Sequence, residues 1–346
     1  METEEDRFMA RCISLASSGR GKVSPNPMVG AVIVCGGRII GEGYHRAYGG
    51  PHAEVEAIRS VSDRSLLHQS TLYVNLEPCC HQGKTPPCAS LIIREGIRRV
   101  VIAGLDPYHA VCGGGVAMLR EAGVEVVIGV KEGEAGLLNK AFITSHTLGR
   151  PYIFLKWAQS ADGFIDRLRS GAGTPPAIFS TPLTMQDVHR KRSEMMAIMV
   201  GTRTALFDNP SLTVRLWSGK SPVRVVIDRN LSIPAGYNIF DGKAPLIVFT
   251  ALTRAATPRA EYVTIDFGRD TLRQILAHLY GRNIISLMVE GGSYLINSFI
   301  ERGLWDNMQI ETSPIRLGDG VKAPRTDHIE RPLKNISYGR NKIQLY

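Results

Sequence analysis

Residues 51–58 read PHAEVEAI, and residues 76–88 read LEPCCHQGKTPPC. The first segment places a histidine two positions before a glutamate, and the second contains two cysteines that each directly follow a proline. A His-x-Glu pair followed by two prolyl cysteines is typical of zinc-dependent nucleobase deaminases. We therefore predict that His52, Cys79 and Cys88 bind zinc and that Glu54 transfers protons.

The chemistry of such a site explains these residue types. Three protein ligands leave the fourth tetrahedral position of a catalytic zinc ion for water, whose pKa falls from about 15.7 to about 7 on binding. Thiolates and imidazoles suit zinc, whereas magnesium and calcium prefer oxygen ligands. Cys80 and His81 lie in the same segment and are alternative ligands, although neither follows a proline.

Apolar runs around these residues predict the elements that hold them. The run GAVIV at 30–34 indicates a buried strand, and 53–58 opens an apolar-periodic helix. Strands and helices continue to alternate, which predicts an α/β layer with parallel strand pairs. Further helices are expected at 6–18, 89–95 and 118–121, and further strands at 38–41, 70–76, 100–103 and 124–128.

Length and composition limit the possible protein classes. A chain of 346 residues is long for one domain and suits two, and 44% apolar with 21% charged residues is ordinary for a soluble protein. Six unevenly spaced cysteines and an acidic METEEDRF start favour a cytoplasmic protein, and no apolar run predicts membrane insertion. The net charge of +9 is compatible with nucleic acid, but no basic run is present, which favours phosphorylated small molecules.

The second half begins after a short polar segment. Residues 144–150 are polar and contain a glycine, so we expect domains at 1–146 and 147–346. The turn Glu290-Gly291-Gly292 precedes a helix expected to run through residue 298, and its amides could approach a phosphate, although such turns are common in α/β proteins. The absence of G-x-G-x-x-G argues against a Rossmann fold. Strands are expected at 152–157, 195–200, 223–228, 245–250 and 284–289, and a helix at 186–193.

Several motifs of the first half resemble the deaminase domain of the bifunctional riboflavin-biosynthesis deaminase/reductase family. They are SPNPMVGAVIV at 24–34, GEGYH at 41–45, and the two segments that contain the expected ligands; the eight residues between Cys79 and Cys88 distinguish them from the tighter Pro-Cys-x-x-Cys of other deaminases. The resemblance implies a cytidine-deaminase-like three-layer α/β domain. It also implies that Asn26 holds the pyrimidine and that His45, Lys84 and Asp106 line the substrate site. Tyr108 departs from the asparagine usual in the family.

The second half resembles the reductase domain of the same family, which has a dihydrofolate-reductase-like fold. The matching motifs are LKWAQSADGFI at 155–165, VGTRTALFDNPSLTVR at 200–215 and VEGGSYLINSF at 289–299. Ile178 replaces the family's usual tryptophan, and Arg229 replaces a small polar residue. The resemblance implies NADPH contacts from Ala158, Thr204, Asp208, Gly292, Ser293, Tyr294, Leu295 and Ile296. It implies substrate contacts from Lys156, Arg192, Leu212, Arg215 and Glu290.

Together the two resemblances imply a bifunctional enzyme of riboflavin synthesis. The first domain would deaminate 2,5-diamino-6-ribosylamino-4(3H)-pyrimidinone 5′-phosphate hydrolytically with one zinc ion, and the second would reduce the ribosyl group to ribityl with NADPH. We expect a homodimer or tetramer without nucleic-acid or membrane partners. The alternatives are a nucleic-acid deaminase, a non-catalytic zinc protein, and a deaminase with a weakened reductase.

Overall fold

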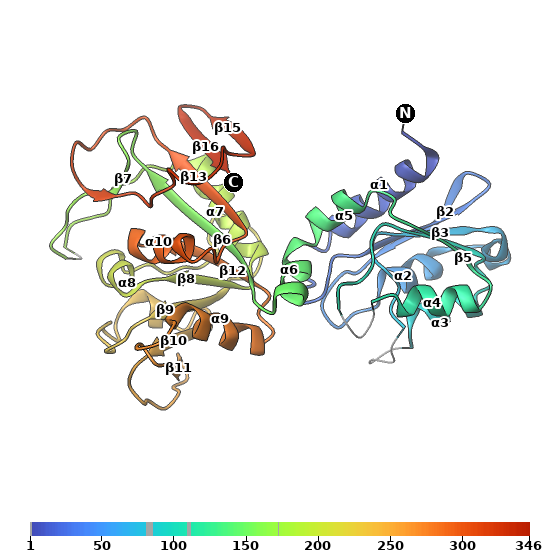
Figure 1. Cartoon of the computed structure of the whole chain (residues 1–346), viewed down its shortest axis with the longest axis horizontal. Coiled ribbons are helices and arrows are strands. Elements are labelled where there is room, and N and C mark those ends of the chain that lie inside the picture. The colour runs from blue at the N-terminus through green and yellow to red at the C-terminus, as the bar shows by residue number, and fades with distance from the viewer. Residues whose placement is uncertain (1, 81–85, 109–111, 172) are drawn as a thin grey trace. The chain divides into compact units, whose positions relative to one another are not determined.

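The protein consists of two compact units, Met1–Gly149 and Arg150–Tyr346 (Figure 1). This computed structural model describes residues 2–80, 86–108, 112–171 and 173–346. The polar segment expected at 144–150 is mostly helical, because α6 (Lys140–Leu148) buries Phe142 and Ser145 and ends at Gly149 in the left-handed conformation. The domain boundary expected after residue 146 therefore falls inside this helix.

The first unit is built on a five-stranded sheet in the order β2-β1-β3-β4-β5. Strand β1 pairs antiparallel with β2 and β3, whereas β3, β4 and β5 are parallel, as the alternation of strands and helices predicts. These strands cover Gly30–Cys35 (β1), Arg38–Tyr44 (β2), Thr71–Val74 (β3), Arg99–Ile102 (β4) and Glu125–Ile128 (β5).

Helices cover both faces of this sheet and make a three-layer unit (Figure 1). The side chains of β1 alternate between the two faces, since Ile33 packs in one apolar core with Ala57, while Val32 packs in the other with Met9 and Ala135. The first core contains α2 (Ala53–Ser60), α3 (Cys88–Arg94) and α4 (Gly114–Glu121), and the second contains α1 (Glu4–Ser17) and α5 (Glu132–Leu138). A short helix, η1 (Arg64–Gln69), precedes β3.

The second unit contains a nine-stranded sheet in the order β11-β10-β9-β8-β12-β6-β13-β16-β15. Its first seven strands are parallel, and β16 and β15 add antiparallel pairs. Strand β7 (Phe164–Asp166) pairs separately with β14 (Val321–Lys322). The strands of the large sheet are β6 (Tyr152–Gln159), β8 (Ala197–Val200), β9 (Val223–Ile227), β10 (Leu246–Thr250), β11 (Glu261–Thr264), β12 (Ser286–Gly291), β13 (Asn307–Thr312), β15 (Lys334–Tyr338) and β16 (Asn341–Leu345).

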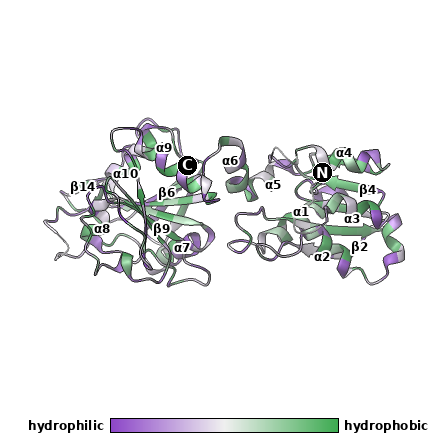
Figure 2. Cartoon of the chain, turned by 90° about the horizontal axis from the view of Figure 1, so that it is seen from below, coloured by the Kyte–Doolittle hydropathy of each residue, from purple (hydrophilic) through white to green (hydrophobic). Residues whose placement is uncertain are grey.

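Two apolar cores flank the large sheet. One joins the strands to α9 (Thr271–Gly281) and α10 (Ser293–Glu301), and the other joins them to α8 (Thr202–Asp208) and the segment around η2 (Asn238–Phe240). Helix α7 (Pro182–Glu194) begins at the capping residue Thr181. Hydrophobic residues colour much of the central strands green in Figure 2, as expected for a sheet covered on both faces.

Most expected elements are present, with ends displaced by one to several residues. The elements not predicted from the sequence include α5, α6, α8, α9, β7, β11, β13, β14, β15 and β16. Within the described part of the chain, no helix is both long enough and apolar enough to cross a bilayer. The observed architecture confirms the predicted α/β class.

Candidate zinc centre and reductase cleft

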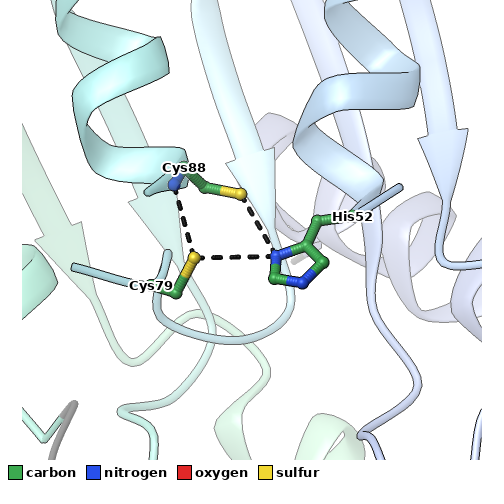
Figure 3. Close-up of side chains that lie close together, drawn as sticks. All are labelled: His52, Cys79 and Cys88. Carbon is green, nitrogen blue, oxygen red and sulfur yellow. Dashed lines mark hydrogen bonds between the residues drawn. The ribbon is translucent and has the colours of Figure 1, made fainter. Parts of the chain in front are cut away.

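The three expected metal ligands converge from separate elements of the first unit (Figure 3). His52 directly precedes α2, Cys79 follows β3, and Cys88 is the first residue of α3. The His52 Nδ1 atom lies 3.3 Å from Cys88 Sγ and 3.6 Å from Cys79 Sγ. One donor atom from each of the three residues fits within 4.8 Å of the others. Two sulfurs and one imidazole nitrogen at this spacing fit a zinc ion.

The charge states of the three expected ligands are coupled through their hydrogen bonds. A hydrogen bond from the Cys88 thiol, reinforced by His52, lowers the pKa of Cys79, while the hydrogen bond to Cys79 and burial raise the pKa of Cys88. Without a metal the pair therefore keeps one proton, and a bound cation would displace it. Glu54 is 3% exposed, and burial raises the pKa of its carboxyl group, which His52 partly opposes. A raised carboxyl pKa suits a group that takes and returns a proton near neutral pH.

Asn26 and His45 lie beside this centre. His45 Nδ1 lies 2.9 Å from the Pro51 carbonyl oxygen, and because a carbonyl can only accept, Nδ1 carries the proton. The neutral ring then accepts at Nε2 from Asn26 Nδ2, 3.1 Å away. Burial lowers the pKa of His45, which keeps it neutral. Its ring meets that of His52 edge-on at 5.7 Å between centroids.

Asp106 and Tyr108 follow β4 near the carboxyl end of the sheet. Asp106 is buried, and its Oδ1 accepts from the Tyr108 backbone N–H at 2.8 Å. The Tyr108 ring lies 5.0 Å from the ring of His146 in α6, a contact with no sequence signal. Lys84, expected in the substrate site, and His81, the alternative ligand, lie outside the described residues.

Glu77 is a buried residue of this region that the sequence prediction missed. Its carboxylate accepts three backbone N–H groups, from Asp106 at 3.2 Å, Gly113 at 3.0 Å and Val116 at 3.0 Å. It thereby ties the segment that contains Cys79 to the start of α4 and to the start of the Asp106 loop. Its position two residues before Cys79 is the only signal in the sequence.

The second unit contains a cleft of about 400 Å³ whose lining includes the ends of β6 and β12 and the start of α10. Gly291 and Gly292 form part of its wall, where a Cβ on Gly291 would lie 2.8 Å from a side-chain carbon of Thr204. Leu295 instead packs in the core, because it faces inward from α10. Nine expected residues line the cleft: Lys156, Ala158, Thr204, Asp208, Glu290, Gly292, Ser293, Tyr294 and Ile296.

The remaining expected substrate residues gather around Thr213. Arg192 in α7 forms a two-pronged ion pair with Glu290 and donates to the Thr213 carbonyl oxygen at 3.3 Å. Arg215 Nη1 donates to the Thr213 hydroxyl at 3.1 Å. Leu212, one residue earlier, is buried and has a left-handed φ of 52°.

A buried histidine that sequence reasoning missed supports this group. His189 Nδ1 accepts from the Arg215 backbone N–H at 3.0 Å. Burial, together with the charges of Arg192 and Arg215, lowers the pKa of His189 to about 4. The imidazole is therefore a neutral acceptor that holds the segment containing Arg215.

Lys156 and Glu311 form a buried polar region beside the cleft. Burial lowers the pKa of Lys156, and the nearby carboxylates of Glu290 and Glu311 oppose this shift. Glu311 receives hydrogen bonds from Ser180, Thr184 and Asn341 at 2.6–2.7 Å. Sequence reasoning missed Glu311 because its partners come from distant segments.

Arg169 is another missed residue at the cleft. Its side chain is almost fully buried and forms ion pairs with both Asp166 and Asp208, so it fixes the expected cofactor residue Asp208. Ile178, which replaces the family's tryptophan, also lines the cleft and is 71% exposed. Arg229 lies over the Phe267 ring, 5.4 Å from its centroid, and is not among the lining residues.

The fold and the two sites together define a class of protein. A three-layer unit with a His-Cys-Cys centre beside a buried glutamate is a zinc-binding deaminase domain, and the second unit is a reductase domain. Family models agree, since residues 2–104 match the cytidine and deoxycytidylate deaminase zinc-binding region, and residues 151–337 match the RibD C-terminal domain.

Comparison with whole proteins gives the same assignment, and the chain belongs to the RibD family of riboflavin biosynthesis proteins. It is 40% identical to RibD of Aquifex aeolicus over 92% of this chain and 89% of that protein. It is 35% identical to RibD of Escherichia coli over 92% of this chain and 90% of that protein.

Solved structures of similar proteins match the fold of this chain over nearly its whole length. The crystal structure of a diaminohydroxyphosphoribosylaminopyrimidine deaminase/5-amino-6-(5-phosphoribosylamino)uracil reductase from Thermotoga maritima is 38% identical, with a TM-score of 0.88, and covers 99% of this chain and 98% of that one. Acinetobacter baumannii RibD in form 1 is 30% identical, with a TM-score of 0.89 and the same coverage. The expected cytidine-deaminase-like and reductase domains are therefore confirmed.

Proposed function

We propose that this protein catalyses two consecutive reactions of riboflavin synthesis. It would deaminate 2,5-diamino-6-ribosylamino-4(3H)-pyrimidinone 5′-phosphate and then reduce the product with NADPH to 5-amino-6-ribitylaminouracil 5′-phosphate. The observation that carries the proposal is the convergence of His52, Cys79 and Cys88 beside buried Glu54 in a chain that also has the reductase cleft. The name of the Thermotoga maritima relative, with the same two activities, supports it.

The deaminase half needs an activated water molecule and a proton carrier. A zinc ion held by His52, Cys79 and Cys88 would supply Lewis-acid activation of water at neutral pH. Glu54 would accept the proton of the attacking water and deliver it to the ring nitrogen, and its raised pKa allows it to hold the proton between these steps. Glu54 would then pass the second proton of the water to the exocyclic amine, which leaves as ammonia while the ring carbon becomes a carbonyl.

The neighbouring residues would orient the pyrimidine. The Asn26 Nδ2 atom donates a hydrogen bond to His45. The Asn26 Oδ1 atom would then accept from other donors, such as the ring N–H and amine groups of a pyrimidine. Asp106 is held by backbone contacts at the edge of the same site. Lys84, from the segment between the cysteines, is proposed as a further contact on the resemblance alone.

The reductase half needs positioning rather than a metal. NADPH would supply the hydride, with its phosphates near the first amides of α10 and Thr204. Arg192 and Arg215 would hold the substrate phosphate, because guanidinium groups match phosphate oxygens. Lys156 is buried and close to Glu290, and its lowered pKa would let it give a proton to the opening sugar ring.

We also propose a cytoplasmic homodimer or homotetramer that takes a small phosphorylated pyrimidine and no nucleic acid. The RibD relatives are biosynthetic proteins, and the described residues include no membrane-spanning helix. Sedimentation of the purified protein tests the oligomeric state, and a monomer at micromolar concentration would contradict it.

Separate assays of the two half-reactions test the proposed function. Arg192→Ala should abolish NADPH oxidation on the deaminated intermediate but leave ammonia release unchanged, because Arg192 lies in the second unit. Wild-type protein that releases no ammonia from the diaminopyrimidine phosphate would overturn the first activity. A wild-type protein that deaminates but oxidises no NADPH would overturn the second, and would favour the weakened reductase suggested by Ile178.

A further inference from the structure

Two buried asparagines hold the backbone that carries Asn26. Asn75, just after β3, accepts from the Gly30 N–H at 2.7 Å and donates to the Met28 carbonyl oxygen at 3.0 Å. Asn139, between α5 and α6, accepts from the Met28 N–H at 2.8 Å and donates to the same carbonyl oxygen at 2.9 Å. Each side-chain amide thus binds the backbone as a neighbouring strand would.

The Asn139 side chain is buried and uses both of its polar atoms to bind Met28. The residue is 3% exposed, and Met28 lies 111 positions earlier in the chain. Its backbone N–H is used separately, because it donates to Ala135 and Gly136 at the end of α5. The two helices are therefore placed so that a single side chain reaches the Met28 backbone.

The contact leads directly to the proposed pyrimidine site. Met28 is two residues after Asn26, with only Pro27 between them, and proline fixes φ in this short connection. Asn26 in turn donates to His45, whose Nδ1–H donates to Pro51 next to His52. Hydrogen bonds from Asn139 to Met28, the backbone from Met28 to Asn26, and hydrogen bonds from Asn26 through His45 to Pro51 therefore connect Asn139 to the residue before the first metal ligand.

We propose that Asn139 is a positioning residue of the deaminase site, which sets where the Asn26 amide stands against the pyrimidine. This inference rests on the proposed deaminase function. Asn75 continues to bind the Gly30 N–H and the Met28 carbonyl oxygen, so loss of the Asn139 side chain should leave the sheet folded; the Met28 N–H loses its acceptor, which should shift the Asn26–Met28 segment. Substrate affinity should then fall, while zinc binding and the proton transfer by Glu54 persist.

The test is steady-state ammonia release by full-length Asn139→Ala with measured zinc content. Loss of two buried hydrogen bonds predicts a KM for the diaminopyrimidine phosphate that is roughly tenfold higher, with kcat reduced less than about twofold. NADPH oxidation on the deaminated intermediate, which belongs to the other unit, should be unchanged and reports the concentration of protein with an intact second unit, while the zinc content reports on the first unit. Leu137→Ala is the matched control, because Leu137 is two residues away on α5 and 74% exposed.

A purely structural role predicts a different pattern. Asn139→Ala would then lose zinc and active fraction, with an unchanged KM in the molecules that remain active, and that result would overturn the inference. If the alanine variant lacks zinc altogether, the KM of Asn139→Asp distinguishes the two roles. This variant keeps an acceptor for the Met28 N–H but removes the donor to its carbonyl oxygen, so its KM should also rise, and an unchanged KM would reject the proposal. No ammonia release by the wild type would instead reject the proposed function itself.

Discussion

Glu54 is the residue on which the proposed deaminase mechanism depends most. Glu54→Gln keeps the size of the side chain but removes the proton carrier, so ammonia release should fall by roughly 10²–10⁴-fold. Zinc should stay bound, because the three expected ligands are unchanged. The measurement is kcat for ammonia release together with zinc content. Retained activity, or loss of zinc in this variant, would show that Glu54 has a different role.

His189 gives a pH prediction for the second unit. Its folded-state pKa, about 4, lies below the ordinary value of 6.5. Between pH 4 and pH 6.5 the imidazole is therefore protonated in the unfolded chain and neutral in the folded chain. The free energy of unfolding should therefore fall as the pH drops from about 6.5 to about 4, by at most about 1.4 kcal/mol per pH unit from this group. His189→Asn keeps an acceptor for the Arg215 N–H and should remove this contribution.

Tryptophan fluorescence in urea is a suitable readout, because all three tryptophans, Trp157, Trp217 and Trp305, lie in the second unit. The difference in unfolding free energy between His189→Asn and the wild type should shift in favour of the variant as the pH falls. A difference that stays constant from pH 7 to pH 4.5 would contradict a neutral, buried His189.

The sequence predicts a residue's chemistry where the relevant residues are close along the chain. The roles expected of His52, Glu54, Cys79 and Cys88 follow from short spacings, and the structure brings the three ligands together. The supporting side chains Glu77, Asn139, His189 and Glu311 bind groups in segments far away in sequence. No local pattern marks such residues, because their partners are set by the tertiary fold.

At the scale of elements, the start of α4 packs directly against the segment that contains Cys79. A Cβ on Gly115 would lie 2.0 Å from the Pro78 carbonyl oxygen, a distance that requires backbone movement. Gly115→Ala should therefore destabilise the first unit by about 1–3 kcal/mol and weaken zinc retention, because Pro78 directly precedes Cys79. Thermal unfolding and zinc content after dialysis against a chelator measure both effects.

Gly133→Ala is the matched control for this prediction. Gly133 is also helical, in α5, but a Cβ there would meet no atom within 4 Å. We expect this variant to retain zinc and to be unchanged or more stable by up to about 1 kcal/mol. Equal behaviour of the two variants would show that the close approach of α4 to Pro78 has no energetic consequence.

The elements that sequence reasoning missed have physical explanations. The segment 144–150 has the composition of a linker, yet α6 forms because Phe142 and Ser145 face the interior of the first unit. Helix α9 has an apolar stripe at Leu272, Ile275 and Leu279, and this helical periodicity is visible in the sequence itself. The antiparallel strands β15 and β16 have mixed burial; β16 pairs with β13 and β15 pairs with β16, and a local pattern does not show such pairing.

In the whole molecule the deaminase site and the reductase cleft lie in different units, so the two activities can be measured and abolished separately. All three expected zinc ligands belong to the first unit, and every residue that lines the reductase cleft belongs to the second. Removal of zinc with a chelator should abolish ammonia release, and NADPH oxidation on supplied deaminated intermediate should continue at its original rate. Added zinc should restore the first activity. A reductase rate that falls in step with zinc content would show that the two units are not independent.

The most direct test of the account is the stoichiometry of the coupled reaction on protein whose zinc content is known. The diaminopyrimidine phosphate is supplied with NADPH, and ammonia and NADP⁺ are counted to completion. We expect about one zinc ion per chain, one ammonia released per substrate, and one NADPH oxidised for each ammonia, with no oxidation before deamination. NADPH oxidation without ammonia release, or zinc-loaded protein that produces neither product, would contradict it.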